Sequence, residues 1–434
     1  MIRTLASLGA LFSSMGILLL GGGLLGTLLA LRMGLEGVPS QIIGLVMACY
    51  SVGFVLATLV SARIIQAVGH IRCFAAFAAL ASVSALMHGL FFDPWLWAAM
   101  RILFGFSVAS LYMVTESWLN DRTPREYRGQ VLSFYVIVTS LALGSGQFLL
   151  GIWDVSGYQL FSLAAILLAS ALVPVALAQI SSPEIRPTRR VGLRQLYDIS
   201  PLGTYTAFAS GIINGGFFAL GPVFAAAIGF GANAVATFMG SAILGGLFLQ
   251  YLIGRMSDRH DRRLVISIVT AVVALLSLAM AMIHAVPLWV VIVLAGLWGG
   301  FNFTVYALGL ALAHDFMESD ERVPASATLL LTHGVGMIIG PVVLAQVMGA
   351  FGEESLFFGF AVMAATVTVF GWYRARVGES ILVEDQEQYQ SAPQSLVSTP
   401  LSVALDPQAE DDPQLEFDFS PDEEDGMGMN EVEI

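Results

Sequence analysis

The chain has 434 residues, of which 57% are hydrophobic and only 12% are charged. With a mean hydropathy of +0.79, this composition excludes an ordinary soluble domain. The formal net charge of −13 is local, because 16 of the 32 acidic residues lie in residues 377–434. The remaining sequence sets 19 arginines against 16 acids, a net charge of +3. The acidity therefore gives no indication of an acidic substrate, and no nucleic-acid partner is expected.

Twelve apolar stretches of roughly 20 residues or more follow one another along the chain, each long enough to cross a hydrocarbon core of about 30 Å. The first is too long for the core of a signal peptide and predicts a retained helix. The pattern predicts an all-α membrane protein with twelve transmembrane helices. The stretches are approximately 4–31, 41–63, 73–92, 95–119, 130–153, 159–180, 202–228, 234–256, 264–284, 288–313, 324–351 and 355–374.

All 19 basic residues are arginines, and their distribution predicts the orientation. When the N-terminus is placed in the cytoplasm, only Arg32 falls outside, Arg101 falls within a span, and every other arginine is cytoplasmic. Basic loops resist translocation across the membrane. We therefore expect a multi-pass protein of a bacterial inner membrane with both termini in the cytoplasm.

The spans form two similar halves, offset by about 192 residues in the early spans and 194 in the fourth and tenth. This repeat predicts two six-helix bundles of parallel topology, at residues 1–180 and 202–376. Residues 181–201, rich in proline and arginine, are expected to form a cytoplasmic linker with a short helix near Arg194–Tyr197. Residues 377–434 have the composition of a disordered acidic tail. The matching pairs are Gly37/Gly229, Gln41/Asn233, Gly53/Gly245, Tyr112/Tyr306 and Asp121/Asp315.

The sequence GRMSDRHDRR, which begins at Gly254, lies between the eighth and ninth spans. It is similar to the G-x-x-x-D-R-x-G-R-R hairpin of the major facilitator superfamily of secondary transporters, with Asp261 in place of the second glycine. Arg101 and Gly105 match a second, shorter element, R-x-x-x-G. Together with the twelve spans and the central linker, these motifs make residues 1–376 resemble that superfamily. The glycine-proline element often seen in the fifth span of its antiporters is absent here, because Gln147 follows Gly146.

In the superfamily, this hairpin latches the two halves together in the outward-facing state. The resemblance implies that Asp258 meets the start of the eleventh span near Pro324, where the partial positive charge of a helix N-terminus would attract it. The alternative is that the arginines only anchor the loop at the cytoplasmic face. The residues assigned to the latch are Gly254, Asp258, Arg259, Arg262 and Arg263.

Arg101 and Glu116 are charged side chains inside the apolar fourth span, where an unpaired charge costs several kcal/mol. They share one helix face with Tyr112, but a helical rise of about 22 Å prevents them from pairing directly. We predict that Glu116 carries the proton in coupled transport and that Arg101 belongs to the same path. Alternatively, Glu116 is a structural carboxylate bound to the loop 122–128. Arg101 could equally bind an anionic substrate or the backbone carbonyls of neighbouring helices.

Substrate cavities of the superfamily lie between the halves near mid-membrane, lined mainly by spans one, four, seven and ten. The resemblance therefore assigns Tyr112, Asn214, Asn302 and Tyr306 to substrate binding. Asn302 and Tyr306 are one helical turn apart and share a face. A buried amide needs a partner, which can be a ligand or a neighbouring helix.

These features predict a secondary transporter that moves a small solute by alternating access, with proton coupling as the energy source. An enzyme is not expected, because the chain has no nucleophile triad or zinc-ligand set, and without lysine it has no phosphate-binding loop. We expect a monomer in the lipid bilayer with no cofactor or metal, whose partners are the solute and protons. The alternative function is a non-transporting membrane sensor or scaffold that recruits a cytoplasmic partner through its acidic tail.

Overall fold

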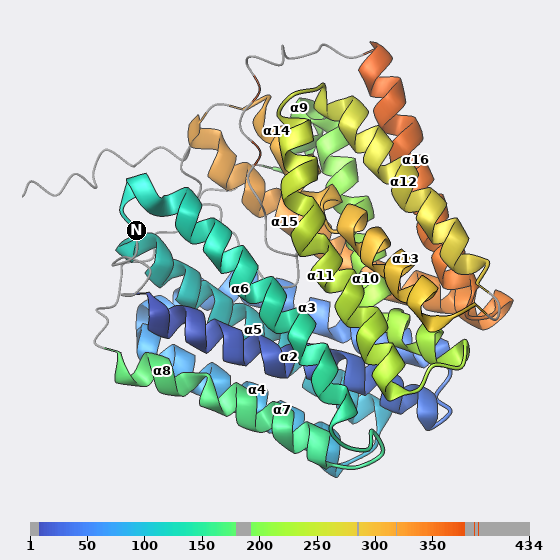
Figure 1. The fold of residues 1–434 in the computed structure, drawn as a ribbon. Coiled ribbons are helices and arrows are strands. Elements are labelled where there is room, and N and C mark those ends of the chain that lie inside the picture. Colours follow the sequence, from blue (N-terminus) through green and yellow to red (C-terminus); the bar gives the residue numbers. More distant parts are fainter. Residues whose placement is uncertain are drawn as a thin grey trace, which may run out of the picture.

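The computed structural model describes residues 8–178, 192–283, 286–317 and 319–377, together with Gln386 and Tyr389. These residues contain no strand, and 12 of their helices are long and apolar enough to cross a membrane (Figure 1). The expected all-α fold with twelve spans is therefore confirmed. Apart from Val377, Gln386 and Tyr389, the tail predicted to be disordered lies outside the described residues, as does most of the linker.

Each half contributes six spans, and one span in each half is broken into two helices. The short helix expected in the linker is present as α9, Leu193–Ile199. The first half consists of α2 (Gly9–Leu35), α3 (Ser40–Val68), α4 (His70–Leu90), α5 (Pro94–Arg122), α6 (Arg128–Phe148), and the pair α7 (Gln159–Ser170) and α8 (Leu172–Leu177). The second half consists of α10 (Pro201–Ala227), α11 (Ala232–Ser257), α12 (Arg262–Ala281), the pair α13 (Leu288–Asn302) and α14 (Val305–His314), α15 (Ser319–Phe351) and α16 (Ser355–Val377).

The two breaks have local causes. Between α7 and α8, Pro174 lacks an amide hydrogen and cannot continue the hydrogen-bond ladder to Ser170. Between α13 and α14, Thr304 donates its hydroxyl to the Phe301 carbonyl at 2.6 Å, which occupies a backbone acceptor at the bend. The sixth and tenth spans were each predicted as one continuous stretch, and the structure differs at these two points.

The helices of the two halves pack in corresponding pairs. In the first half α3 packs on α5 and α4 on α7, and in the second half α11 packs on α13 and α12 on α16. Gly37 and Gly229, which are equivalent in the repeat, end their helices with positive φ angles of 73° and 91°. Gly53 and Gly245 both lie against a backbone carbonyl of the helix on which their own helix packs. The weak sequence repeat therefore corresponds to equivalent positions in space.

Contacts between the halves run mainly through α3 with α15 and α6 with α11. We call the end of the bundle that holds the hairpins α3–α4 and α11–α12 the arginine-rich end, because Arg63, Arg72, Arg122, Arg255 and Arg259 lie there. Some described glycines of one half contact the other half closely, and they lie near mid-membrane or toward the end opposite the arginines. Gly44 contacts Pro341, and Gly240 contacts Phe148. In Figure 1 the halves converge toward the lower right and diverge toward the upper left. The structure is thus closed at the end opposite the arginines.

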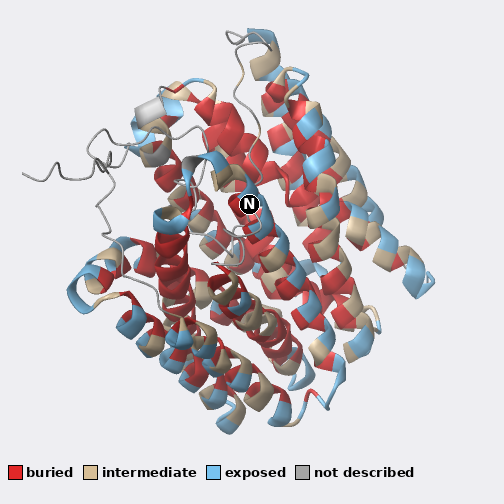
Figure 2. Cartoon of the chain, turned by 60° about the vertical axis from the view of Figure 1, so that its left-hand side comes forward, coloured by how far each residue is buried: buried red, intermediate tan, exposed pale blue. Residues whose placement is uncertain are grey.

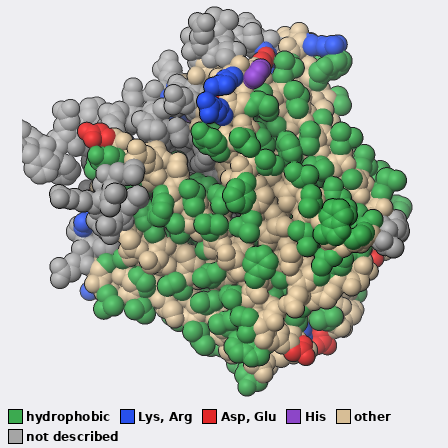
Figure 3. All heavy atoms as spheres, in the orientation of Figure 1, with side chains coloured by type: hydrophobic (Ala, Val, Ile, Leu, Met, Phe, Trp, Pro, Cys, Tyr) green, Lys and Arg blue, Asp and Glu red, His purple; other side chains and the backbone are tan. Residues whose placement is uncertain are grey.

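Burial follows the position of each helix relative to the centre (Figure 2). In α10, 89% of the apolar window is buried, compared with 39% in the peripheral α16. Large apolar side chains on the outer helices, such as Phe248, Leu275 and Val369, are exposed. Figure 3 shows hydrophobic side chains covering the flank, with charged groups gathered toward its ends. This is the surface expected of a bundle whose solvent is lipid.

Candidate functional site

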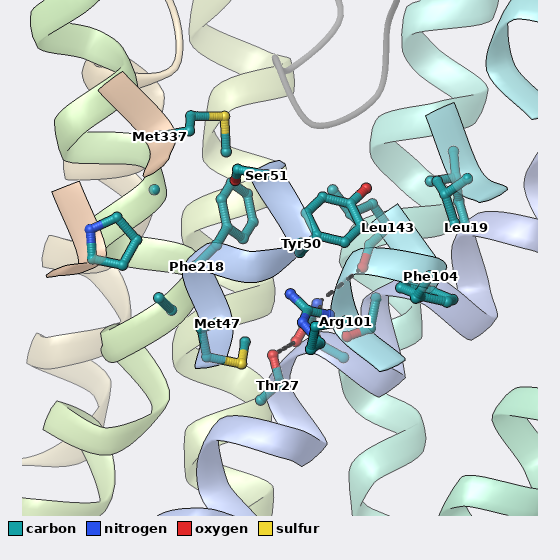
Figure 4. A pocket seen from close by; sticks show the side chains of 18 of the residues that line it. Leu19, Thr27, Met47, Tyr50, Ser51, Arg101, Phe104, Leu143, Phe218 and Met337 are labelled. Atoms are coloured by element: carbon teal, nitrogen blue, oxygen red, sulfur yellow. Dashed lines mark hydrogen bonds between the residues drawn. The ribbon is translucent and has the colours of Figure 1, made fainter. Parts of the chain in front are cut away.

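A cavity of about 70 Å³ lies between the two halves (Figure 4). One water molecule needs roughly 10–15 Å³, so several waters or a small organic molecule can enter. Six helices line the cavity: α2, α3, α5 and α6 of the first half, and α10 and α15 of the second. Its polar lining residues are Thr27, Tyr50, Ser51, Arg101, Tyr112 and Gln147, and its larger apolar ones include Leu18, Met47, Phe104, Leu143, Phe218 and Met337.

Arg101 is the only charged side chain among the described residues that line this cavity. It is 5% exposed, and its guanidinium carbon lies 4.7 Å from the centre of the Tyr50 ring. The Phe104 ring lies 6.0 Å away on the same helix. Within the described part of the chain, Nε of Arg101 is buried without a hydrogen-bond partner. Two aromatic faces thus hold the cation, and no carboxylate of the described lining neutralises it.

Gln147 lies on the cavity wall with its amide already engaged. Its Oε1 accepts a hydrogen bond from the Thr27 hydroxyl at 2.5 Å, and its Nε2 donates to the Gly23 carbonyl at 3.1 Å. A Cβ at Gly23 would come within 2.5 Å of the Leu143 carbonyl, so only glycine permits this approach of α2 to α6. The amide therefore joins two helices of the first half beside Arg101.

Glu116 lies outside the cavity lining, between the cavity and the arginine-rich end. Its side chain is fully buried and accepts a hydrogen bond from the Tyr135 hydroxyl of α6 at 3.1 Å. Tyr112, one helical turn earlier on α5, is buried and lines the cavity. The helix α5 therefore carries Arg101 and Tyr112 at the cavity and Glu116 beyond it.

The two asparagines are buried in the second half and do not line the cavity. Asn302 donates its Nδ2 to Oδ1 of Asn214 at 2.7 Å, which joins α13 to α10. Tyr306 packs its ring on His333, with 4.7 Å between the ring centres, and His333 in turn meets the Ser210 hydroxyl of α10 at 3.0 Å. In this conformation these residues make helix contacts, and their predicted role in substrate binding remains a prediction.

The hairpin between α11 and α12 is built around Arg262, whose side chain is completely buried. Arg262 forms an ion pair with Asp315 at the end of α14 and a second with Asp258 at 3.1 Å. It also donates to the Ala311 carbonyl at 3.2 Å and to the Ser257 hydroxyl at 3.1 Å. These bonds hold the hairpin to helices of its own half.

Asp261 and Arg263 fix the start of α12. The Asp261 carboxylate caps the helix by accepting from the Arg263 backbone amide at 2.9 Å, and it pairs with the Arg263 guanidinium at 2.7 Å. Burial opposes ionisation of Asp261, but the hydrogen bonds from Arg263 outweigh it and hold the pKa of this carboxyl below its usual value. Arg263 also donates to the Arg374 carbonyl of α16 at 3.2 Å. The residue that replaces the family's second glycine is therefore a helix cap.

In the present conformation Asp258 is engaged by residues other than Pro324. Its described partners are Arg262 and the backbone amide of Tyr389, which donates to Asp258 at 2.7 Å. Across the interface between the halves, α11 packs against α6, and α15 packs against α3. The second helix of each half thus faces the fifth helix of the other half in this conformation. The predicted contact near Pro324 in the outward-facing state stays a prediction.

Tyr389, beyond the last span, places its ring directly on Gly254. A Cβ at Gly254 would come within 2.2 Å of the Tyr389 ring, so the bare backbone of this motif glycine makes room for the aromatic side chain. Burial raises the pKa of the Tyr389 phenol. The remaining motif residue, Arg259, is exposed at the arginine-rich end.

Sequence reasoning identified two of the polar cavity residues, Arg101 and Tyr112, and missed Thr27, Tyr50, Ser51 and Gln147. Gln147 carried a detectable signal, because it is a polar amide in an apolar span and follows Gly146 where the glycine-proline element of antiporters would have proline. Tyr50 gave none, since a single tyrosine in a span is as consistent with packing as with a site. Its importance comes from its position under the Arg101 guanidinium, which only the crossing of α3 and α5 reveals.

The geometry defines a polytopic membrane protein of two pseudo-equivalent helical bundles around a central cavity. The sequence model of the Major Facilitator Superfamily matches residues 11–306 and 205–409, and the chain belongs to this family. It is a secondary transporter and not an enzyme. An uncharacterized MFS-type transporter of Yersinia pestis (strain Pestoides F) is 28% identical over 347 residues, which cover 78% of this chain and 88% of the relative. The uncharacterized MFS-type transporter YcaD of Escherichia fergusonii is 25% identical over 360 residues, covering 82% and 92%.

Solved transporter structures share the fold at low sequence identity. The nucleoside transporter NupG superposes with a TM-score of 0.72 at 13% identity, covering 85% of this chain and 99% of its own. A bacterial homolog of the human lysosomal transporter Spinster, in an inward-facing and occupied conformation, gives 0.70 at 11% identity, with 88% and 97% covered. A D-xylose–proton symporter gives 0.66 at 13% identity, with 84% and 97% covered. At these identities the likeness shows the fold alone.

Proposed function

We propose that this chain moves a small solute through the cavity around Arg101 by alternating access, and that Glu116 couples the movement to protons. In this proposal the arginine-rich end is the cytoplasmic end, because cytoplasmic loops of membrane proteins carry an excess of basic residues. The structure, closed at the other end, then corresponds to an inward-facing conformation. Both termini lie in the cytoplasm of a bacterial cell, and the transporter acts as a monomer in the inner membrane.

The observation that carries the proton coupling is the position of Glu116. A carboxyl fully enclosed in a membrane bundle is expensive and marks a functional pathway more often than a packing site. Glu116 receives a hydrogen bond from Tyr135 of α6, and α6 packs against α11 of the other half. A movement between the halves would therefore change the surroundings of this carboxyl, which is the requirement for taking up a proton on one side and releasing it on the other.

Transport in proteoliposomes tests this proposal. Vesicles holding the purified chain are given a defined mixture of sugars, nucleosides, amino acids and small carboxylates under an imposed pH gradient, and their contents are measured by mass spectrometry. We expect at least one solute to accumulate against its concentration gradient. Glu116→Gln should abolish this accumulation while exchange of the same solute across equilibrated membranes continues, because the cavity is unchanged.

Glu36→Gln is the matched control, since it removes a carboxylate that pairs with Arg32 at the opposite end of the bundle. This variant should accumulate solute as the unaltered protein does. If Glu116→Gln retained gradient-driven accumulation, Glu116 would not be the coupling group. Exchange of no solute by the unaltered protein would refute transport itself.

The latch role of the hairpin remains a prediction for the outward-facing state. In the present conformation Asp258 is engaged by Arg262 and Tyr389. Since α11 faces α6, closure at the arginine-rich end would bring Gly254 and Asp258 toward the start of α6 rather than that of α15. The hairpin arginines Arg259, Arg262 and Arg263 would remain attached to the second half.

A further inference from the structure

We propose that the solute is a small organic monoanion, with one carboxylate bound by Arg101 and an apolar body held by the rest of the cavity. This inference rests on the proposed transport function and adds the class of substrate. It starts from an imbalance of charge in the cavity. The described lining holds one cation and no acidic side chain.

The protein itself offsets only part of the cost of burying Arg101. Its described neighbours supply two aromatic faces but neither a hydrogen bond nor an ion pair, and its Nε is buried without a partner. A cation over an aromatic ring regains only part of the hydration free energy that it loses on leaving water. An anion entering the cavity would supply the missing partner.

Glu116 does not supply this countercharge. It lies on the same helix as Arg101, fifteen residues away, which corresponds to a rise of about 22 Å. Gln147, the nearest polar candidate on α6, has both amide atoms bonded to Thr27 and to backbone carbonyls. The positive charge on the cavity wall is therefore left for the solute.

The shape of the guanidinium favours a carboxylate. Arginine presents its donors in a planar fork that matches two oxygen atoms side by side. Tyr50 packs against this group from α3, with its ring centre 4.7 Å from the guanidinium carbon. The larger side chains of the wall are apolar on both halves, with Leu18, Met47, Phe104, Leu143, Phe218 and Met337 lining the cavity, and the other polar groups of the described lining carry no charge. One carboxylate is thus satisfied at Arg101, whereas a second would find no cation to offset its desolvation cost.

Equilibrium binding to the purified, full-length protein tests the charge requirement. The probes are benzoate, benzamide and benzamidinium, which share one shape and carry charges of minus one, zero and plus one, with butyrate and butyramide as a smaller pair. Binding is followed by thermal shift and titration calorimetry, because a ligand that binds the folded state stabilises it. We expect saturable binding of benzoate or butyrate and none of the neutral or cationic probes. This comparison uses the unaltered protein and does not depend on the folding of a variant.

Variants then locate the charge. Arg101→Gln should weaken carboxylate binding by at least about tenfold, a loss of roughly 1.4 kcal/mol. Arg101→Lys should retain part of the affinity, since it keeps the charge but loses the planar fork. Arg32→Gln is the matched control and should bind as the unaltered protein does, because Arg32 pairs with Glu36 outside the cavity.

Three results would overturn the inference: equal binding of benzamide and benzoate, unchanged carboxylate binding by Arg101→Gln, or no binding of either carboxylate at millimolar concentrations. The measurement needs no gradient and no membrane crossing. Carboxylate binding without any transport would refute the proposed function alone, whereas proton-driven transport of neutral solutes only would refute the anion alone.

Discussion

The ion pair between Arg262 and Asp315 gives a quantitative test of the packing at the arginine-rich end. The exposed fractions of the two side chains are 0% and 2%, so the pair is removed from solvent. Asp315→Asn would leave the guanidinium with Asp258, the Ala311 carbonyl and the Ser257 hydroxyl. Of these only Asp258 carries charge, and it is 34% exposed.

Removing one partner of a buried ion pair typically costs 3–5 kcal/mol. Because Asp258 compensates in part, we expect a loss of about 3 kcal/mol of unfolding free energy for Asp315→Asn, near the lower limit of that range. Arg262→Met should cost a similar amount, since it removes the buried cation that pairs with Asp315. The double variant Arg262→Met/Asp315→Leu should recover most of the loss, because an apolar pair of similar volume removes both buried charges.

The unfolding free energies of the parent protein, the two single variants and the double variant are measured on the purified proteins in mixed micelles. The pair Arg32–Glu36 is the control, with exposed fractions of 17% and 40%. Its removal should cost no more than about 1 kcal/mol, as for other exposed pairs. If Asp315→Asn cost no more than Glu36→Gln, or if the double variant were as unstable as the sum of the single ones, the hairpin would not depend on this buried pair.

Three further variants test separate contacts. Gly105→Ala should lower the melting temperature strongly, because the added Cβ would lie 2.0 Å from a backbone oxygen of α3. The overpacking cost should be about 1–3 kcal/mol. Gly9→Ala is the control and should be neutral, since a Cβ at Gly9 would meet no atom within 4 Å. Asp261→Asn should destabilise the protein by less than about 1 kcal/mol at neutral pH. Because folding lowers the pKa of Asp261 below its ordinary value of 3.8, the carboxylate stabilises the fold above pH 3.8. The melting temperatures of variant and parent should therefore converge as the pH falls below 3.8. Tyr389→Ala should lower the melting temperature as much as truncation after residue 377 does. Truncation after residue 390 should leave the melting temperature unchanged. Equal melting temperatures for the two truncated proteins would show that the Tyr389 contact adds no stability.

The sequence was sufficient for the fold because hydrocarbon imposes a single strong requirement. Every span must satisfy its own backbone and present apolar side chains, so length and hydropathy identify each helix. The same reasoning could not locate the break after Asn302. That break coincides with a hydroxyl–carbonyl bond from Thr304 to Phe301, which neither the length nor the hydropathy of a span reveals.

The site was predictable only in part, for a different physical reason. A charge inside a span is conspicuous, so Arg101 and Glu116 could be selected from the sequence. Whether an asparagine faces a cavity or another helix depends on the rotation of its helix, which apolar composition leaves undetermined. Asn214 shows this directly: its neighbour Gly215 lines the cavity, while the Asn214 side chain turns toward α13.

The helix α5 connects the two proposals, because it carries both charged groups and is held rigidly in the first half. Gly53 and Gly105 bring α3 and α5 into backbone contact, where any Cβ would clash with a carbonyl oxygen. This contact also fixes Tyr50 beneath the guanidinium of Arg101. Movement of the second half would therefore change what faces Arg101 from α10 and α15, and what packs on α6 beside Glu116, without bending α5. An anion at one end of this helix and a proton at the other can then respond to the same rearrangement while remaining too far apart to neutralise each other.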